Sequence, residues 1–145
     1  MTEPRATADA LELAYRALRV RDRSERELDE RLAARGVAEV AREEALATLR
    51  RTGLVDDRRF AERRASALAG RGSGNGLIRH DLDSAGVSEN VVEEAVAALD
   101  PELERARAVV ERRGTGARTA RYLTGKGFSD DVVRAVAGGS RDELG

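Results

Sequence analysis

The chain has 145 residues, which is the size of one domain or of a short array of small modules. It contains no cysteine, so disulfide bonds and thiolate metal sites are excluded. Charged residues make up 37% of the chain, with a net charge of -1, so we expect slender helical units with much surface. Aromatic residues make up only 3%, so we expect cores of Leu, Val and Ala.

The first unit is expected to hold three helices. One helix is predicted from Thr7 to about Arg21, after frayed residues 1–6. Ser24 and Glu27 then form a Ser-x-x-Glu capping box, in which each side chain bonds to the backbone of the other residue and marks the start of the second helix. A third helix is predicted over residues 38–51.

The second unit is expected to begin with a capped helix, in which Asp56 is the N-cap and Phe60 is buried. Glycines alternate with other residues over 70–76, as in some phosphate-binding loops. No apolar strand precedes this stretch and no Gly-Lys-Ser/Thr follows it, so we expect a flexible loop between helices instead. The next helix is predicted to bury Ile78 and Leu82.

The third unit repeats this organisation in a shorter form. Asp100 and Pro101 are expected to start it, as an N-cap and a first-turn proline. The eighth helix is predicted to end at Lys126. Ser88 and Ser129 stand at the N-cap positions of the sixth and ninth helices, so each unit is expected to close with a third helix.

One helix ending occurs three times. It consists of a leucine, three further residues, a glycine and a large apolar residue. The copies are residues 32–37, 82–87 and 123–128. The glycine is expected to take the left-handed conformation, and the apolar residue to fold back onto the helix. Three copies in similar surroundings predict an all-α protein of three tandem three-helix repeats, which resemble helix-turn-helix units. We expect repeats at 1–52, 53–99 and 100–138, and a flexible tail at 139–145.

Basic residues gather around the junction between the first and second helix of each unit. The stretch 105–126 holds seven basic residues and one acidic residue, and the stretch 63–80 holds four arginines and no carboxylate. Arginine supplies 25 of the 26 basic residues, and its planar fork suits phosphate. If the units stack with similar geometry, these junctions form a stripe that follows a phosphate backbone. A solvated surface without a ligand is the alternative.

Catalytic chemistry has little support in the residue pattern. The only histidine, His80, is predicted on a polar helix face without a second metal ligand at suitable spacing. Asp56 and Asp57 precede a helix, where capping and the helix dipole explain them. We expect no enzyme, no cofactor and no metal site. With neither a signal peptide nor a long apolar run, we expect a soluble, cytoplasmic protein.

The chain resembles the RecX family, the bacterial regulators of the RecA recombinase, over residues 10–137. The resemblance rests on the order and spacing of short motifs. They are Arg23-Ser24-x-x-Glu27-Leu28, Gly53-Leu54-Val55-Asp56-Asp57-x-x-Phe60-Ala61, Gly72-x-Gly74, Ile78-x-x-Asp81-Leu82-x-x-x-Gly86-Val87 and Leu123-x-x-x-Gly127-Phe128. The resemblance implies a curved, elongated molecule that binds in the groove of the RecA–single-stranded DNA filament. It also implies inhibition of strand exchange, ATP hydrolysis and co-protease activity, which would limit recombination and the SOS response.

Ten basic residues are candidates for contacts to DNA, in a protein that we expect to be a monomer. Gly76 and Leu77 stand where the family usually carries basic residues, so we expect the main contact in the third repeat. The first group of candidates is Arg112, Arg113, Arg118, Arg121 and Lys126. The second group is Arg21, Arg23, Arg26, Arg71 and Arg79.

Two other functions remain open at this point. A helix-turn-helix regulator that reads duplex DNA would also consist of small helices joined by tight glycine turns. It would need base-reading side chains on a recognition helix, whereas the third helices here begin with acidic residues. A helical scaffold for some other protein would show no salt-sensitive binding to nucleic acid.

Overall fold

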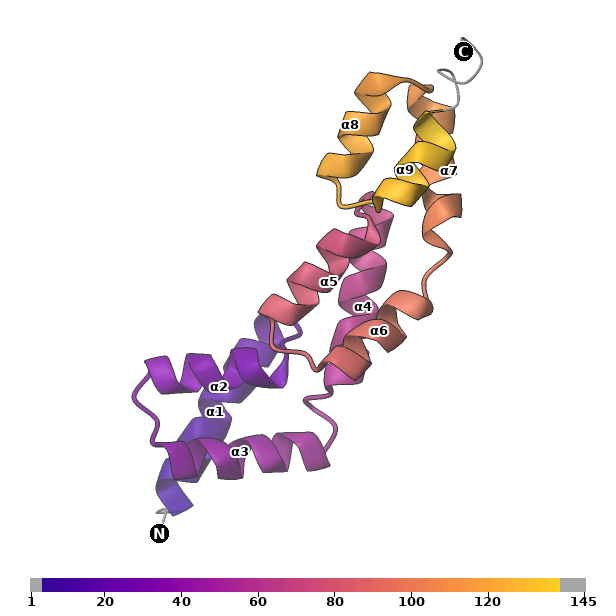
Figure 1. Cartoon of the computed structure of the whole chain (residues 1–145). Helices are drawn as coiled ribbons and strands as arrows, with labels where there is room; N and C mark the ends of the chain where they lie inside the picture. Colours follow the sequence, from indigo (N-terminus) through magenta and orange to yellow (C-terminus); the bar gives the residue numbers. More distant parts are fainter. Residues whose placement is uncertain (1–3, 139–145) are drawn as a thin grey trace.

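The computed structural model describes residues 4–138, and within this range the chain forms nine α-helices and no strand. The helices are α1 Pro4–Val20, α2 Glu25–Ala34, α3 Glu39–Arg51, α4 Asp57–Gly70, α5 Asn75–Ser84, α6 Glu89–Ala97, α7 Glu102–Arg113, α8 Ala117–Gly125 and α9 Asp130–Ala137. They form an elongated, gently curved array with α1 near one end and α9 near the other (Figure 1). The expected tail at 139–145 lies outside the described residues.

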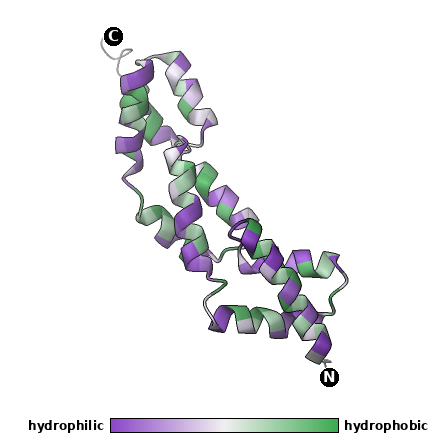
Figure 2. Ribbon diagram, turned by 180° about the vertical axis from the view of Figure 1, so that it is seen from behind, coloured by the Kyte–Doolittle hydropathy of each residue, from purple (hydrophilic) through white to green (hydrophobic). Residues whose placement is uncertain are grey.

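Each third of the array is a three-helix module with a core of its own. Helices α1–α3 form module 1, α4–α6 form module 2 and α7–α9 form module 3, and the first and third helix of each module pack most extensively. Three separate apolar clusters contain Leu28, Ile78 and Leu123, one in each module. Green and purple residues alternate along the helices in Figure 2, as helices with one buried side require. The predicted fold class is confirmed; the expected repeat boundaries fall between the modules and stay predictions.

The three predicted helix endings share one geometry. Gly36, Gly86 and Gly127 have φ values of 84°, 83° and 91°. In each ending, the N–H of the apolar residue after the glycine donates to the carbonyl of the leucine, over 3.1 to 3.2 Å. The capping box at Ser24 and the side-chain cap at Asp56 are also present as predicted. Local sequence patterns therefore determine where most of the helices begin and end.

Two predicted helix starts are wrong by a few residues. Helix α1 begins at Pro4 and not at Thr7, because proline fits the first turn of a helix and Thr7 Oγ1 donates to a glutamate on α3 at 3.0 Å. The N-cap of α7 is Pro101 and not Asp100, because Pro101 is still extended, with ψ at 140°.

Modules 1 and 2 meet where the N-terminus of α2 abuts the C-terminus of α5. The buried hydroxyl of Ser24, the N-cap of α2, donates to the carbonyl of Ala85, the C-cap of α5, at 2.5 Å. The N–H of Glu25 donates to Oδ1 of Asp57, the first residue of α4, at 2.8 Å. The guanidinium of Arg26 donates to the last carbonyl of α5 at 3.0 Å. We call this contact joint 1.

Modules 2 and 3 meet in the same way at joint 2, where the N-terminus of α5 abuts the C-terminus of α8. The N–H groups of Gly74 and Gly76 donate to the carbonyls of Lys126 and Gly127, at 2.7 and 2.9 Å. Glu102, the first residue of α7, accepts the N–H of the residue between the two glycines at 2.7 Å. Joint 2 therefore combines two backbone-to-backbone bonds with side-chain bonds from Glu102 and Arg105.

The glycine-rich stretch 70–76 is part of joint 2, so the expectation of a flexible loop is wrong. Ser73 and Gly74 are buried. A Cβ added to Gly74 would lie 2.4 Å from the backbone nitrogen of Phe128, closer than packed atoms come. The glycine is needed because two backbones touch here, and not because the segment moves.

The two joints use equivalent positions of the repeat. In both, the N-cap of a module's middle helix, α2 or α5, donates to the C-cap of the middle helix of the next module, α5 or α8. The acid that begins the first helix of that next module, Asp57 or Glu102, accepts the N–H of the first residue of α2 or α5. Helices α8, α5 and α2 consequently follow one another head to tail along one side of the molecule (Figure 1). Backbone groups at the ends of these three helices, which would otherwise lack hydrogen-bond partners, are bonded at the joints. The positive end of one helix dipole also lies against the negative end of the next.

We expect alanine at two of the helix-ending glycines, Gly36 and Gly127, to destabilise the protein by amounts that depend on their place in the array. Gly36→Ala should cost only the left-handed conformation, roughly 1–2 kcal/mol, because nothing lies within 4 Å of an added Cβ. Gly127→Ala should cost about 1–3 kcal/mol more, because its Cβ would lie 2.6 Å from the backbone nitrogen of Leu77. Urea unfolding of both variants measures the difference, and equal losses would contradict a tight joint 2.

The pH dependence of stability should report on Asp57. Burial raises the pKa of this carboxyl above its ordinary 3.8, and the nearby carboxylates of Glu25 and Asp56 raise it further, while the N–H that it accepts opposes the shift. The folded state therefore binds this proton more tightly than the unfolded state. The contribution of Asp57 to stability rises as the pH falls through the raised pKa towards 3.8.

Asp57→Asn keeps an acceptor for the Glu25 N–H and removes the buried charge. We expect it to be at least as stable as the wild type at neutral pH and to lose this part of the pH dependence. Asp57→Leu leaves the N–H unpaired and should cost about 1–3 kcal/mol. Urea unfolding over a pH series measures both variants. An Asn variant as unstable as the Leu variant would show that joint 1 needs the charge itself.

Candidate nucleic-acid interface

The five third-module candidates lie on two consecutive helices and the turn that follows them. Arg112 and Arg113 end α7, Arg118 and Arg121 are exposed on α8, and Lys126 is the C-cap of α8. Within residues 4–138, none of the five forms an ion pair with a carboxylate. Their charge is therefore available to a ligand.

Module 2 adds one more cation across joint 2. Arg71, the exposed C-cap of α4, also has no carboxylate partner in the described part of the chain. A Cβ placed on the neighbouring Gly72 would lie 3.8 Å from Cε of Lys126 and 4.0 Å from the hydroxyl oxygen of Tyr122. The Arg113 guanidinium carbon lies 3.5 Å from the centroid of the Tyr122 ring, a cation–π contact that holds the side chain.

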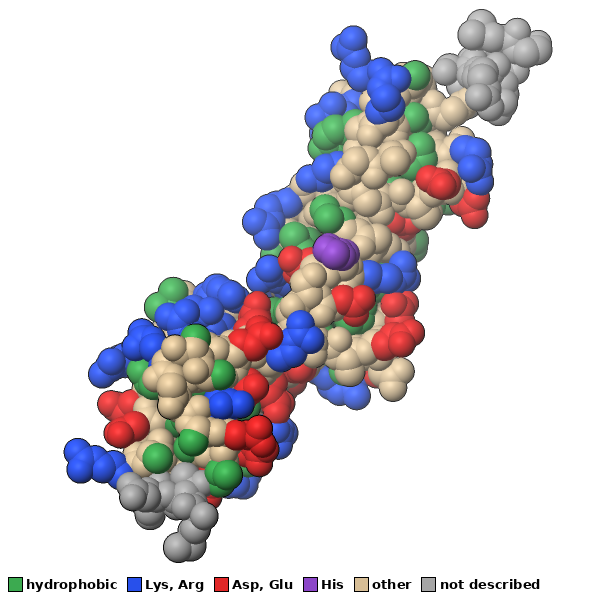
Figure 3. Space-filling model, turned by 60° about the vertical axis from the view of Figure 1, so that its left-hand side comes forward, with side chains coloured by type: hydrophobic (Ala, Val, Ile, Leu, Met, Phe, Trp, Pro, Cys, Tyr) green, Lys and Arg blue, Asp and Glu red, His purple; other side chains and the backbone are tan. Residues whose placement is uncertain are grey.

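These six cations form what we call the cation patch: Arg71, Arg112, Arg113, Arg118, Arg121 and Lys126. Like charges gathered without carboxylates repel one another and create a positive potential, which attracts a polyanion. Figure 3 shows Lys and Arg side chains at intervals along one long edge of the molecule, from module 3 down to module 1. An arrangement of this kind can neutralise successive phosphates of a nucleic-acid backbone.

The other four candidates are engaged by the protein itself. Arg21 and Arg79 pair with carboxylates, over 3.4 and 2.9 Å. Arg23 donates to a carbonyl of α1 at 3.1 Å, and Arg26 holds the end of α5 in joint 1. Burial lowers the pKa of Arg23, and the neighbouring arginines lower it further. The structure does not bring these four into the cation patch, and a DNA contact by them stays a weaker prediction.

Sequence reasoning missed the residues that hold the joints. Arg105 lies in the most basic stretch of the chain, but its guanidinium donates to the carbonyls of Ser73 and Asp100, at 2.9 and 3.1 Å. Burial accordingly lowers its pKa. Asp57 was expected to cap its own helix, whereas it accepts an N–H of α2 from another module. Only the shared register of the repeats signals these roles in the sequence.

The described residues contain no group of three or more His, Cys, Asp and Glu side chains that could hold a metal ion. His80 is exposed on α5, apart from any such group. None of the helices in residues 4–138 is long and apolar enough to cross a membrane.

Comparison with known proteins identifies the family. The family model for the second three-helix domain of RecX matches residues 56–96. The regulatory protein RecX of Halorhodospira halophila is 34% identical, and the match covers 99% of this chain and 96% of that protein. The regulatory protein RecX of Acidithiobacillus ferrooxidans is 32% identical, with 93% of each chain covered.

Solved structures agree on the fold. The crystal structure of RecX from Lactobacillus salivarius matches with a TM-score of 0.80 at 18% identity and covers 92% of this chain and 96% of its own. A second crystal structure of a regulatory protein RecX matches with a TM-score of 0.77 at 24% identity, covering 90% of this chain and 72% of its own. The resemblance seen in the motifs is confirmed, and the chain belongs to the RecX family, whose members are regulatory proteins and not enzymes.

Proposed function

We propose that this protein binds RecA and the RecA–single-stranded DNA filament and inhibits the recombinase, ATPase and co-protease activities of RecA. Membership of the RecX family over nearly the full chain supports this function. The protein would thereby limit recombination and the SOS response. A protein that acts on a filament of RecA and DNA needs contacts to both components. The observation that supports the contact to DNA is the cation patch.

The composition of the cation patch favours contact to phosphates over reading of bases. Its cations come from two modules and have no carboxylate partner within the described residues, so they can replace the counterions of a backbone. Of the two aromatic rings near them, Tyr122 is covered by Arg113 and Phe128 is buried. Base stacking on aromatic side chains therefore contributes little. Single-stranded DNA of any sequence fits such a surface.

The alternative of a helix-turn-helix regulator gains no support from the structure. The third helices of the modules, α3, α6 and α9, begin with Glu39, Glu89 and Asp130. Acidic side chains in a first turn repel phosphates near the end of a helix that would have to enter the major groove.

Reversing two charges of the cation patch should weaken DNA binding. In Arg118→Glu/Arg121→Glu we expect the affinity for oligo-dT to fall at least about tenfold at low salt. The slope of log K against log salt should become shallower by about 1.4, since each phosphate contact to a single strand contributes about 0.7. Fluorescence anisotropy at several salt concentrations measures both quantities.

The matched control is Arg58→Glu/Arg134→Glu. It changes the net charge equally, but both arginines are exposed and paired with carboxylates, Glu94 and Asp131. The control should leave the salt slope unchanged. If both double variants flatten the slope equally, the effect is one of net charge, and the cation patch is not the DNA contact.

The function itself is tested by titrating the protein into pre-formed RecA filaments and measuring the rate of ATP hydrolysis. We expect a progressive decrease at substoichiometric to stoichiometric amounts, and a smaller decrease with Arg118→Glu/Arg121→Glu. An unchanged rate at stoichiometric amounts would contradict the proposed inhibition, whatever the protein does to DNA alone.

A further inference from the structure

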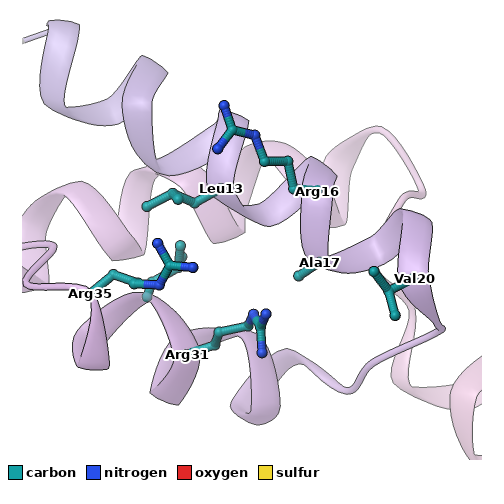
Figure 4. Close-up of a pocket in the computed structure, with 7 residues that line it drawn as sticks. Leu13, Arg16, Ala17, Val20, Arg31 and Arg35 are labelled. Carbon is teal, nitrogen blue, oxygen red and sulfur yellow. The ribbon is translucent and has the colours of Figure 1, made fainter.

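Module 1 carries a pocket that belongs neither to a joint nor to the cation patch. It encloses about 140 Å³ between α1 and α2. Its apolar part includes Leu13, Ala17 and Val20 of α1, and Leu32 of α2 forms part of its wall. Figure 4 shows Arg31 and Arg35 reaching from α2 towards the space between the two helices. Arg16 lies across from them on α1 (Figure 4).

The three arginines of this pocket have no partner in the described residues. None forms an ion pair with a carboxylate or a side-chain hydrogen bond there. Arg31 and Arg35 are one turn apart on α2, where like charges repel. The carboxylate one turn before Arg31 is Glu27, which is committed to Arg21 and to the capping box. The end of α2 favours cations through the helix dipole, but no carboxylate of the described residues offsets the repulsion between the two arginines.

The apolar part of the pocket is equally unexplained by the fold. Val20 ends α1 with 76% of its surface exposed, the largest exposed fraction of any large apolar residue in residues 4–138. It lines the pocket two turns along α1 from the half-buried Leu13 and does not join the core of module 1. An apolar side chain from a ligand that packed against Val20 would remove this surface from water.

The pocket fits an acidic peptide better than a nucleic acid. A single-stranded nucleic acid is held by cations that follow its backbone and by aromatic rings that stack on its bases. Here three cations surround one small aliphatic hollow, and no aromatic ring lines it. A leucine-sized side chain flanked by carboxylates would place its apolar part in the hollow beside Val20 and Ala17. The flanking carboxylates would meet the arginine guanidinium groups, which bind carboxylates through two parallel hydrogen bonds.

We propose that this pocket binds an acidic segment of a protein partner through one aliphatic side chain. This inference rests on the proposed function in one respect: it takes RecA as the protein partner that carries the acidic segment. The protein contact would then lie on module 1 and the DNA contact on modules 2 and 3. The two sites would be separated along the length of the array.

The test uses three labelled probes with the full-length chain. They are a short peptide of leucines flanked by glutamates, the same peptide with serine in place of leucine, and an oligo-dT of matched charge. We expect Arg31→Glu/Arg35→Glu to weaken binding of the leucine peptide at least about tenfold and to leave oligo-dT binding unchanged. Val20→Ser should weaken the leucine peptide alone. The serine peptide should bind the wild type at least about tenfold more weakly than the leucine peptide.

Matched controls separate the pocket from general charge and from stability. Arg19→Glu/Arg51→Glu also reverses two exposed arginines in last helical turns, outside the pocket, and Val40→Ser removes another exposed valine, 50% accessible. Neither control should change binding of the leucine peptide. Equal losses in pocket and control variants would overturn the proposal. So would equal binding of the two peptides, or a loss confined to oligo-dT, which would make the pocket a nucleic-acid site.

A parallel measurement with purified RecA in the absence of DNA separates this inference from the proposed function. We expect Arg31→Glu/Arg35→Glu to lose RecA binding and Arg118→Glu/Arg121→Glu to keep it. If the wild type fails to bind RecA, the proposed function is overturned while the peptide probes still decide the pocket. If it binds RecA independently of the pocket arginines, RecA is overturned as the partner of this site.

Discussion

The architecture depends on one contact, which is made twice: the N-terminus of a middle helix meets the C-terminus of the middle helix of the next module. The three apolar cores are separate, so no shared core holds the modules together. Helix ends carry N–H and carbonyl groups that lack partners within the helix. Joint 2 pairs such groups directly, whereas at joint 1 the Ser24 hydroxyl and the Asp57 carboxylate supply the partners. This contact sets the direction of each module relative to the last, and it gives the array its length.

The joints also decide what the basic residues do. Arginine donates to carbonyl groups at helix ends, and at the joints Arg26 and Arg105 are used in this way. In the third module the equivalent N-cap, Gly116, donates to the carbonyl of Ala137 in the same module, at 3.0 Å. The five cations that module 3 contributes to the cation patch form no ion pair with a carboxylate in the described chain. Basic residues of similar stretches of sequence thus hold the joints in some places and stay unpaired with carboxylates in others.

Sequence reasoning succeeded where the determinants are local. The helix endings at Gly36, Gly86 and Gly127 and the capping box at Ser24 involve residues within a few positions of each other, so their patterns can be read directly. The joints pair residues that lie far apart in the chain, such as Ser24 with Ala85. No local pattern distinguishes a glycine in a flexible loop from a glycine that allows close contact with another backbone. The prediction of a flexible loop at 70–76 is wrong for this reason.

The candidate sites could be predicted only in part. A run of basic residues indicated the third module, but it did not show which arginines would be engaged by carbonyls and carboxylates. The pocket of module 1 left no pattern in the sequence, because Arg16 and Arg31 belong to different helices and only the packing of α1 against α2 brings them together.

The two joints differ in the kind of hydrogen bond that holds them. Joint 1 is made largely by side chains, the hydroxyl of Ser24 and the guanidinium of Arg26, which rotate about their own bonds. Joint 2 adds two backbone bonds, from Gly74 to Lys126 and from Gly76 to Gly127, to the side-chain bonds of Glu102 and Arg105. Rotation of one side chain therefore breaks a larger share of joint 1 than of joint 2. Arg71 and Lys126 lie on the two sides of joint 2, at the C-caps of α4 and α8, so this joint fixes how modules 2 and 3 place the cations of the proposed DNA contact.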